Sequence, residues 1–144
     1  MPLVFKKIKY TGLNDKQKEA FNYQKLSAVL ADFGLFTIPL RNDWNGADFL
    51  AQDCDGKFYK IQLKSRLTFD KKYTDNELYI CFRDGENGLW YMYNHADLLR
   101  EVQDKCNKKI EGSKTWRDNK PYHFPKLDGK LVNLLKDYRI PTTD

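Results

Sequence analysis

The chain of 144 residues has little cysteine and histidine. Its three cysteines, Cys54, Cys81 and Cys106, are widely spaced, and it contains only two histidines. No Cys-x-x-Cys pair or Cys/His cluster occurs, so a structural zinc site is not expected. Isolated thiols in odd number are typical of reduced cysteines, and we therefore expect a cytoplasmic protein.

Long apolar runs are also missing. The N-terminal stretch MPLVFKKIKYTGLN reaches its first charged residue after five positions, which does not resemble a signal peptide. No segment has the roughly 20 apolar residues that a membrane-spanning helix needs, so no membrane partner is expected. We find no repeat, low-complexity tract or linker. A single domain over residues 1–144 is therefore predicted, with a core of about 15–99 and a C-terminal loop and helix over 100–144.

What the chain does have is charge and aromatic residues. Charged residues make up 31%, aromatic residues 15% and hydrophobic residues 41% of the sequence, which indicates a globular protein. The formal net charge is +5 and the pI is about 9.0. A basic balance favours a polyanionic partner such as nucleic acid, although many basic proteins bind none.

The pattern of apolar residues predicts a helix, then a run of strands, then two helices. The first helix is capped by Asn14 or Asp15 and stops at Gly34. Strands are expected over residues 35–40, 47–53, 57–69, 77–84 and 89–94, with a turn at 41–46; helices are expected over 94–109 and 130–140, and an irregular segment over 110–129. This order predicts an α/β fold with a central mixed β-sheet flanked by helices.

Polar side chains alternate along the predicted strand FYKIQLKSR, where Gln62 and Lys64 share one face. The length of the preceding turn decides which residue lies opposite them. A two-residue turn would put Asp48 opposite Leu63, on the other face. A three-residue loop ending at Gly56, with positive φ at that glycine, pairs Asp48 with Gln62 instead. We prefer the second register because it keeps the polar side chains together, so that a carboxylate, an amide and an ammonium converge.

The stretches NGADFLAQD, with Asp48, and KIQLKSR, with Gln62-Leu63-Lys64, resemble the PD-(D/E)XK nuclease superfamily. More narrowly, they are similar to members that carry Gln in place of the second acid. The order of elements also matches over roughly residues 15–99. The resemblance implies a restriction-endonuclease-like fold and the Mg²⁺- or Mn²⁺-dependent hydrolysis of phosphodiester bonds in DNA.

The resemblance also implies a role for each matching residue. Asp48, Gln62 and the backbone carbonyl of Leu63 would bind the metal, and Lys64 would orient the attacking water and stabilise charge on the phosphate. Asp48, Gln62 and Lys64 are thus the expected catalytic residues.

A glutamate on the first helix often completes the site in such relatives. The equivalent place falls at or next to Tyr23, where this sequence has Asn22, Tyr23 and Gln24, while Glu19 lies about one turn earlier. A third oxygen ligand is therefore expected from Glu19 or Gln24. The residues expected at the nucleic acid are Lys60, Ser65, Arg66 and Gln24.

Three functions stay open at this point. The first is a metal-dependent endonuclease acting on DNA. The second is a catalytically decayed domain of the same fold that binds nucleic acid without cleaving it. The third is a protein-interaction domain in which the basic charge serves solubility, with Gln62 and Lys64 on an ordinary polar strand face and Asp48 a turn residue. Cutting two strands takes two sites, so analogy also suggests a homodimer.

Overall fold

The computed structural model describes residues 1–44, 46–74 and 77–142. Its helices are α1 (Asp15–Ala31), α2 (His95–Lys105), α3 (Lys114–Arg117) and α4 (Gly129–Leu135), with short 3-10 turns η1 (Tyr10–Gly12), η2 (Lys71–Tyr73) and η3 (Lys136–Tyr138). Its strands are β1 (Phe36–Trp44), β2 (Ala47–Gln52), β3 (Phe58–Lys64), β4 (Leu67–Phe69), β5 (Leu78–Arg83), β6 (Trp90–Asn94) and β7 (Tyr122–Phe124).

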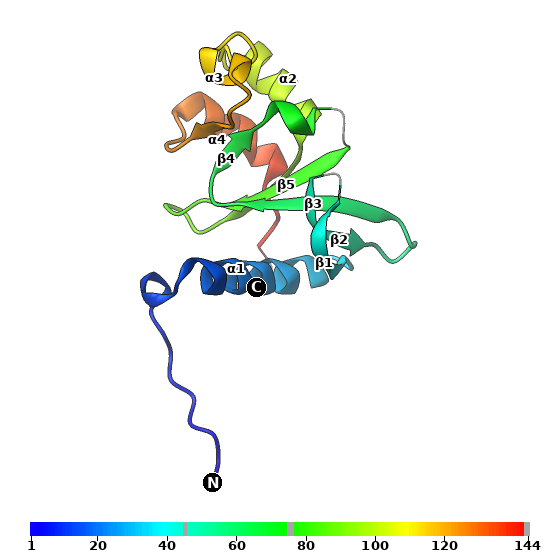
Figure 1. The fold of residues 1–144 in the computed structure, drawn as a ribbon, viewed down its shortest axis with the longest axis vertical. Coiled ribbons are helices and arrows are strands. Elements are labelled where there is room, and N and C mark those ends of the chain that lie inside the picture. The colour runs from blue at the N-terminus through cyan, green and yellow to red at the C-terminus, as the bar shows by residue number, and fades with distance from the viewer. Residues whose placement is uncertain (45, 75–76, 143–144) are drawn as a thin grey trace.

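Five strands form one sheet in the order β1-β2-β3-β5-β6, and β4 pairs with β7 in a small second sheet. Strands β3 and β5 are parallel and the other neighbours are antiparallel, so the main sheet is mixed. Figure 1 shows α1 along one side of this sheet and α2, α3 and α4 on the other. The predicted α/β fold with a mixed sheet flanked by helices is confirmed. Within the described residues, no helix is both long and apolar enough to cross a bilayer.

The first helix begins and ends where the sequence predicts. The Asn14 side chain accepts a hydrogen bond from the backbone N–H of Gln17, and the Gln17 side chain accepts one from the backbone N–H of Asn14. This reciprocal pair satisfies two of the N–H groups that a helix start leaves without partners. After the helix, Gly34 adopts a φ of 72°, and the next residue returns a backbone hydrogen bond to Leu30. The helix therefore stops in the left-handed conformation that glycine accepts most readily.

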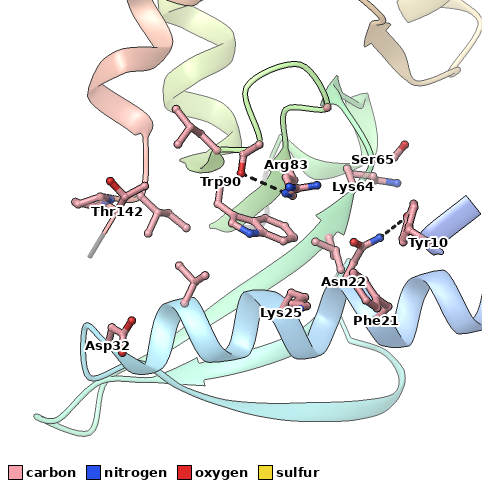
Figure 2. A pocket seen from close by; sticks show the side chains of 17 residues that line it. Tyr10, Phe21, Asn22, Lys25, Asp32, Lys64, Ser65, Arg83, Trp90 and Thr142 are labelled. Atoms are coloured by element: carbon pink, nitrogen blue, oxygen red, sulfur yellow. Dashed lines mark hydrogen bonds between the residues drawn. The ribbon is translucent and has the colours of Figure 1, made fainter. Parts of the chain in front are cut away.

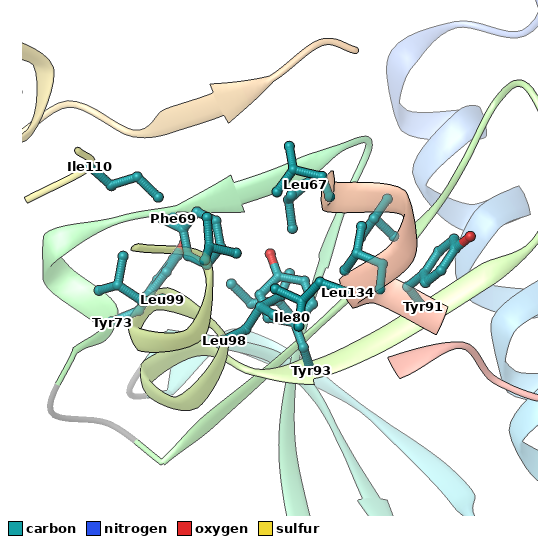
Figure 3. Packing of buried hydrophobic residues seen from close by; sticks show 14 of the residues in the cluster. Leu67, Phe69, Tyr73, Ile80, Tyr91, Tyr93, Leu98, Leu99, Ile110 and Leu134 are labelled. Carbon is teal, nitrogen blue, oxygen red and sulfur yellow. The ribbon is translucent and has the colours of Figure 1, made fainter. Parts of the chain in front are cut away.

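Each face of the sheet carries a hydrophobic cluster. On the α1 face, Leu26 and Leu30 pack with Phe49 and Ile61. The larger cluster lies on the opposite face, between the sheet, α2, α4 and the β4–β7 pair (Figure 3). Its buried members include Leu67, Phe69, Tyr73, Ile80, Tyr91, Tyr93, Leu98, Leu99, Ile110, Trp116, Leu131, Leu134 and Leu135. Residues beyond position 100 thus contribute to the core.

Three element boundaries differ from the prediction. The strand expected over residues 35–40 continues as β1 through most of the predicted turn at 41–46, of which Asn45 lies outside the described residues. The single strand expected over 57–69 breaks at a bend, Ser65–Arg66, and continues as β4 in the second sheet. The segment expected to be irregular contains α3 and β7, which pairs with β4.

The face of the sheet opposite α1 is only partly covered by other elements of the fold. Phe36, Ile38 and Phe58 are 58%, 44% and 51% exposed, so the described residues leave this part of the face open to solvent. In β2 and β3, the residues that alternate with those packed on α1 point to this second face. Asp48 and Gln62 belong to this set, and they therefore lie on the accessible half of the sheet.

Candidate active site at the end of strand β3

The loop between β2 and β3 sets which residues face each other. Gly56 has a φ of 89°. The backbone N–H of Asp53 donates to the Lys57 carbonyl at 2.9 Å, and that of Gly56 donates to Asp53 at 3.1 Å. Along the two strands, the antiparallel pairing runs as far as Phe49 and Ile61. The predicted three-residue loop and positive φ are confirmed, and so is the predicted register as far as Phe49 and Ile61. The pairing of Asp48 with Gln62 stays a prediction.

One step further along this register, the next pair would be Asp48 and Gln62. The ladder would then continue with Ala47 opposite Leu63. Instead, the Oδ2 atom of Asp48 accepts a hydrogen bond of 2.9 Å from the backbone N–H of Leu63. Both backbone groups of a strand residue point to the same neighbouring strand, so the Leu63 carbonyl also faces the edge where Asp48 lies. The structure thus brings the Asp48 carboxylate beside the backbone of the Gln62–Leu63 segment.

Lys64 is the last residue of β3 and is half-buried. Its Nζ atom lies 5.7 Å from the ring centre of Tyr73, which is only 3% exposed. The Tyr73 ring in turn meets the His95 ring edge to face, with centres 5.6 Å apart. A Cβ atom at Gly46 would lie 3.1 Å from the Tyr73 ring, so this glycine lets the start of β2 pass close by. Lys64 is therefore on the same face of the sheet as Asp48.

The helix residues stand apart from this cluster. Glu19 and Gln24 are both exposed, and α1 packs on the opposite face of the sheet from Asp48. Within residues 1–44, 46–74 and 77–142, no group of three or more His, Cys, Asp or Glu side chains is placed to hold a metal ion. The contact that the structure gives is the one between the Asp48 carboxylate and the Leu63 N–H. Metal ligation by Asp48, Gln62 and the Leu63 carbonyl stays a prediction. A ligand from Glu19 and a nucleic-acid contact from Gln24 stay predictions.

The other residues predicted to contact nucleic acid lie in β3 or directly after it. Lys60 is half-buried and sits between Leu50 and Leu78 on the neighbouring strands. Ser65 and Arg66 are exposed in the bend that separates β3 from β4. They are therefore accessible next to Lys64, as a phosphate contact requires.

His123 joins this region from a distant part of the sequence. In the β4–β7 pair it lies opposite Thr68. The Thr68 hydroxyl donates to the Arg66 carbonyl at 2.9 Å, and its oxygen also makes a 2.9 Å hydrogen bond with His123 Nδ1. Burial and then the nearby charges of Arg66 and Lys64 lower the pKa of His123, against a smaller opposing effect of Asp70. The sequence predicts His123 as a loop residue rather than a catalyst, because no local motif connects it to the site, whereas the structure places it in β7.

Comparison with known proteins gives a fold-level similarity only. No family model matches the chain, and no curated protein matches it. Among solved structures, it is similar to one described as "The structure of a bacterial homing endonuclease: I-Ssp6803I", with 14% sequence identity and a TM-score of 0.49. The similarity covers 88% of this chain and 89% of the other.

Proposed function

We propose that the chain is a metal-dependent endonuclease of the PD-(D/E)XK type that hydrolyses phosphodiester bonds in DNA. The observation that carries the proposal is the hydrogen bond from the Leu63 N–H to Asp48, next to a strand register that, continued by one pair, would set Gln62 opposite Asp48. Lys64 follows on the same face. In this proposal a carboxylate, a neutral amide oxygen and an ammonium meet at one accessible point of the sheet.

The donor set fits a hard divalent cation. Mg²⁺ binds oxygen ligands and usually keeps several of its waters, so a few protein oxygens are enough. Asp48, Gln62 and the Leu63 carbonyl would hold Mg²⁺ or Mn²⁺. A ligand from Glu19, on the helix that packs on the other face of the sheet, stays a prediction that only a bound metal would test. A bound ion would polarise a phosphoryl oxygen and lower the pKa of a water molecule.

The protein's own positive charges account for the rest of the mechanism. Lys64 presents an ammonium that stabilises negative charge building on the phosphate, and its packing against Tyr73 fixes its position. Ser65 and Arg66 lie next to it in an exposed bend and contact the flanking phosphates. Lys60 contributes a further positive charge along the same strand.

Two specific observations favour other functions. Asp48 is the one carboxylate among the proposed β2–β3 ligands, which favours a domain that binds nucleic acid without cutting it. The exposed side chains of Phe36, Ile38 and Phe58 favour a protein-interaction domain.

A homodimer belongs to the nuclease proposal, because cutting both strands of a duplex takes two active sites. Light scattering of the purified chain tests this oligomeric state.

The deciding experiment is incubation of the chain with duplex, single-stranded and branched DNA in Mg²⁺, Mn²⁺ or EDTA. We expect cleavage that requires the metal and disappears in Lys64→Ala. Binding that weakens steeply with salt but never leads to cleavage would favour the binding domain. No affinity for DNA at any salt concentration would favour the protein-interaction domain.

A further inference from the structure

A groove of about 840 Å³ opens beside the proposed site (Figure 2). It lies between α1 and the carboxyl ends of the parallel strands β3 and β5. Ligands of open α/β sheets commonly bind at this end of the strands. Among the described residues that line it, Lys25, Lys64 and Arg83 carry positive charge and Asp32 carries negative charge. The balance is positive, and Lys64 belongs to both the groove and the proposed active site.

An aromatic pair stands at one end of this groove. Tyr10 and Phe21 have ring centres 5.3 Å apart, and Tyr10 is 41% exposed. The Asn22 side-chain amide donates to the Tyr10 hydroxyl at 2.9 Å, which ties this ring to α1. Ammonium groups lie over both rings, with Lys18 5.5 Å from the Tyr10 centre and Lys25 5.3 Å from the Phe21 centre. A fixed, accessible ring beside cations suits a nucleobase with its phosphates.

We propose that this groove binds an unpaired nucleotide segment next to the scissile phosphate. One base stacks on Tyr10, and the adjoining phosphates lie near Lys25 and Arg83. A base inside a duplex has both faces covered by its neighbours, so only an unpaired or extruded base can reach the ring. The inference rests on the proposed function, since it takes the substrate to be DNA. It narrows that substrate to DNA with a single-stranded part, such as a flap, an overhang or a junction.

The main competing occupant is the N-terminal arm of a second copy of the chain. Leu3 and Phe5 in this arm are 77% and 86% exposed, and Figure 1 shows the arm extending away from the rest of the protein. The arm also carries Lys6, Lys7 and Lys9. These charges would be placed against a groove that is already positive, whereas a polyanion complements it.

The test measures binding in EDTA, where no metal-dependent cleavage occurs. A fluorescent single strand of roughly 16 nucleotides, and a duplex of the same sequence, are titrated with the chain and followed by anisotropy. Wild-type protein should bind the single strand more tightly. Tyr10→Leu should weaken this binding by about 5- to 150-fold, the range for one base stacked on an aromatic ring. Tyr10→Phe keeps the ring and should stay within about 3-fold of wild type.

A second pair of variants tests how positive charge in the groove contributes to single-strand binding. Lys25→Ala should weaken single-strand binding and reduce the slope of log affinity against log salt by about 0.7. Lys16 lies nine residues earlier, on the opposite side of α1, so Lys16→Ala should leave the slope unchanged. Thermal unfolding confirms that each variant is folded.

The outcomes separate this inference from the proposed function. Equal affinity for single strand and duplex would overturn the proposal that the groove binds an unpaired segment. Wild-type affinity in both Tyr10→Leu and Lys25→Ala would overturn it as well. Groove-dependent binding by a chain that cuts nothing in any metal would support the groove and overturn the nuclease. Metal-dependent cleavage of blunt duplex that is unchanged in Tyr10→Leu would support the nuclease and overturn the proposed role of the groove.

Discussion

The ammonium group of Lys64 lies over the ring of Tyr73, 5.7 Å from its centre. The Tyr73 ring also makes an edge-to-face contact with the fully buried His95. A cation over an aromatic face is attracted by the ring quadrupole, and the attraction strengthens where water is excluded. The packing therefore keeps Lys64 at the end of β3, where the proposed site needs a positive charge.

Replacing Lys64 by alanine should remove cleavage without unfolding the protein. The expected loss in the single-turnover rate is about 10²–10³-fold, the scale for one preorganised charge-stabilising group. Lys60→Ala is the control, because it removes the same charge from the same strand. It should weaken DNA binding but leave the rate at saturating DNA almost unchanged. Equal rate losses in the two variants would show that Lys64 acts only as one more positive charge.

Asp48 has two roles that substitutions can separate. Asp48→Asn keeps an oxygen that can accept from the Leu63 N–H, so the free energy of unfolding should change little while Mn²⁺ affinity falls. Asp48→Ala should lose Mn²⁺ affinity and also about 0.5–1.5 kcal/mol of stability with the hydrogen bond. Calorimetric titration and urea unfolding measure these effects. An Asn variant that binds Mn²⁺ like wild type would remove Asp48 from the proposed ligands.

The register of the site could be predicted because its determinants are local. Gly56 accepts the positive φ that a three-residue loop needs, and the two-residue period of a strand then fixes which side chains face each other. The hydrogen bond between Thr68 and His123 could not be predicted from the sequence, because these residues are 55 positions apart and no nearby pattern links them. Only the assembled β4–β7 pair brings them together.

The length of β1 shows tertiary structure overriding local preference. The segment RNDW is rich in turn-forming residues, and the sequence therefore predicts a turn. Pairing with β2 nevertheless keeps it extended, and a shift in register between Pro39 and Trp44 absorbs the irregularity.

The predicted metal ligand Glu19 is a different case. It was expected from the family resemblance alone, and only a bound metal would test it.

Gly56→Ala should destabilise the protein through the backbone alone. The φ of 89° disfavours any residue with a Cβ atom, while the nearest heavy atom to that Cβ would be 3.8 Å away, so there is no clash. We expect a loss of about 1–2 kcal/mol in the free energy of unfolding, measured in urea. Gly129→Ala is the control, with open space and an ordinary φ at the start of α4. A similar loss in both variants would contradict the role of the loop.

His95 should make stability depend on pH. Burial, partly offset by the Asp70 carboxylate, lowers the pKa of His95 to about 4, from about 6.5 in the unfolded chain. Between these values the unfolded chain binds more protons, so the free energy of unfolding falls as pH decreases from about 6.5 to about 4. The total loss is about 3 kcal/mol.

The matched variant is His95→Gln, whose amide oxygen can still accept from the Asp70 N–H that now bonds to His95 Nε2. It does not titrate, so its unfolding free energy should lose less than that of wild type over the same pH range. Urea unfolding at several pH values measures the difference. Parallel curves for the two proteins would show that His95 does not carry the effect.

Gln62→Glu tests the function most directly. It places a second carboxylate opposite Asp48, and affinity for a hard cation rises with the number of charged ligands. Mg²⁺ affinity should increase by at least about tenfold, and cleavage should survive at lower metal concentration. Gln52→Glu is the control, because it adds the same charge at the far end of the β2–β3 pair. If neither variant changes metal affinity, and wild type cuts no DNA with Mg²⁺ or Mn²⁺, the domain that binds nucleic acid without cleaving it becomes the better explanation.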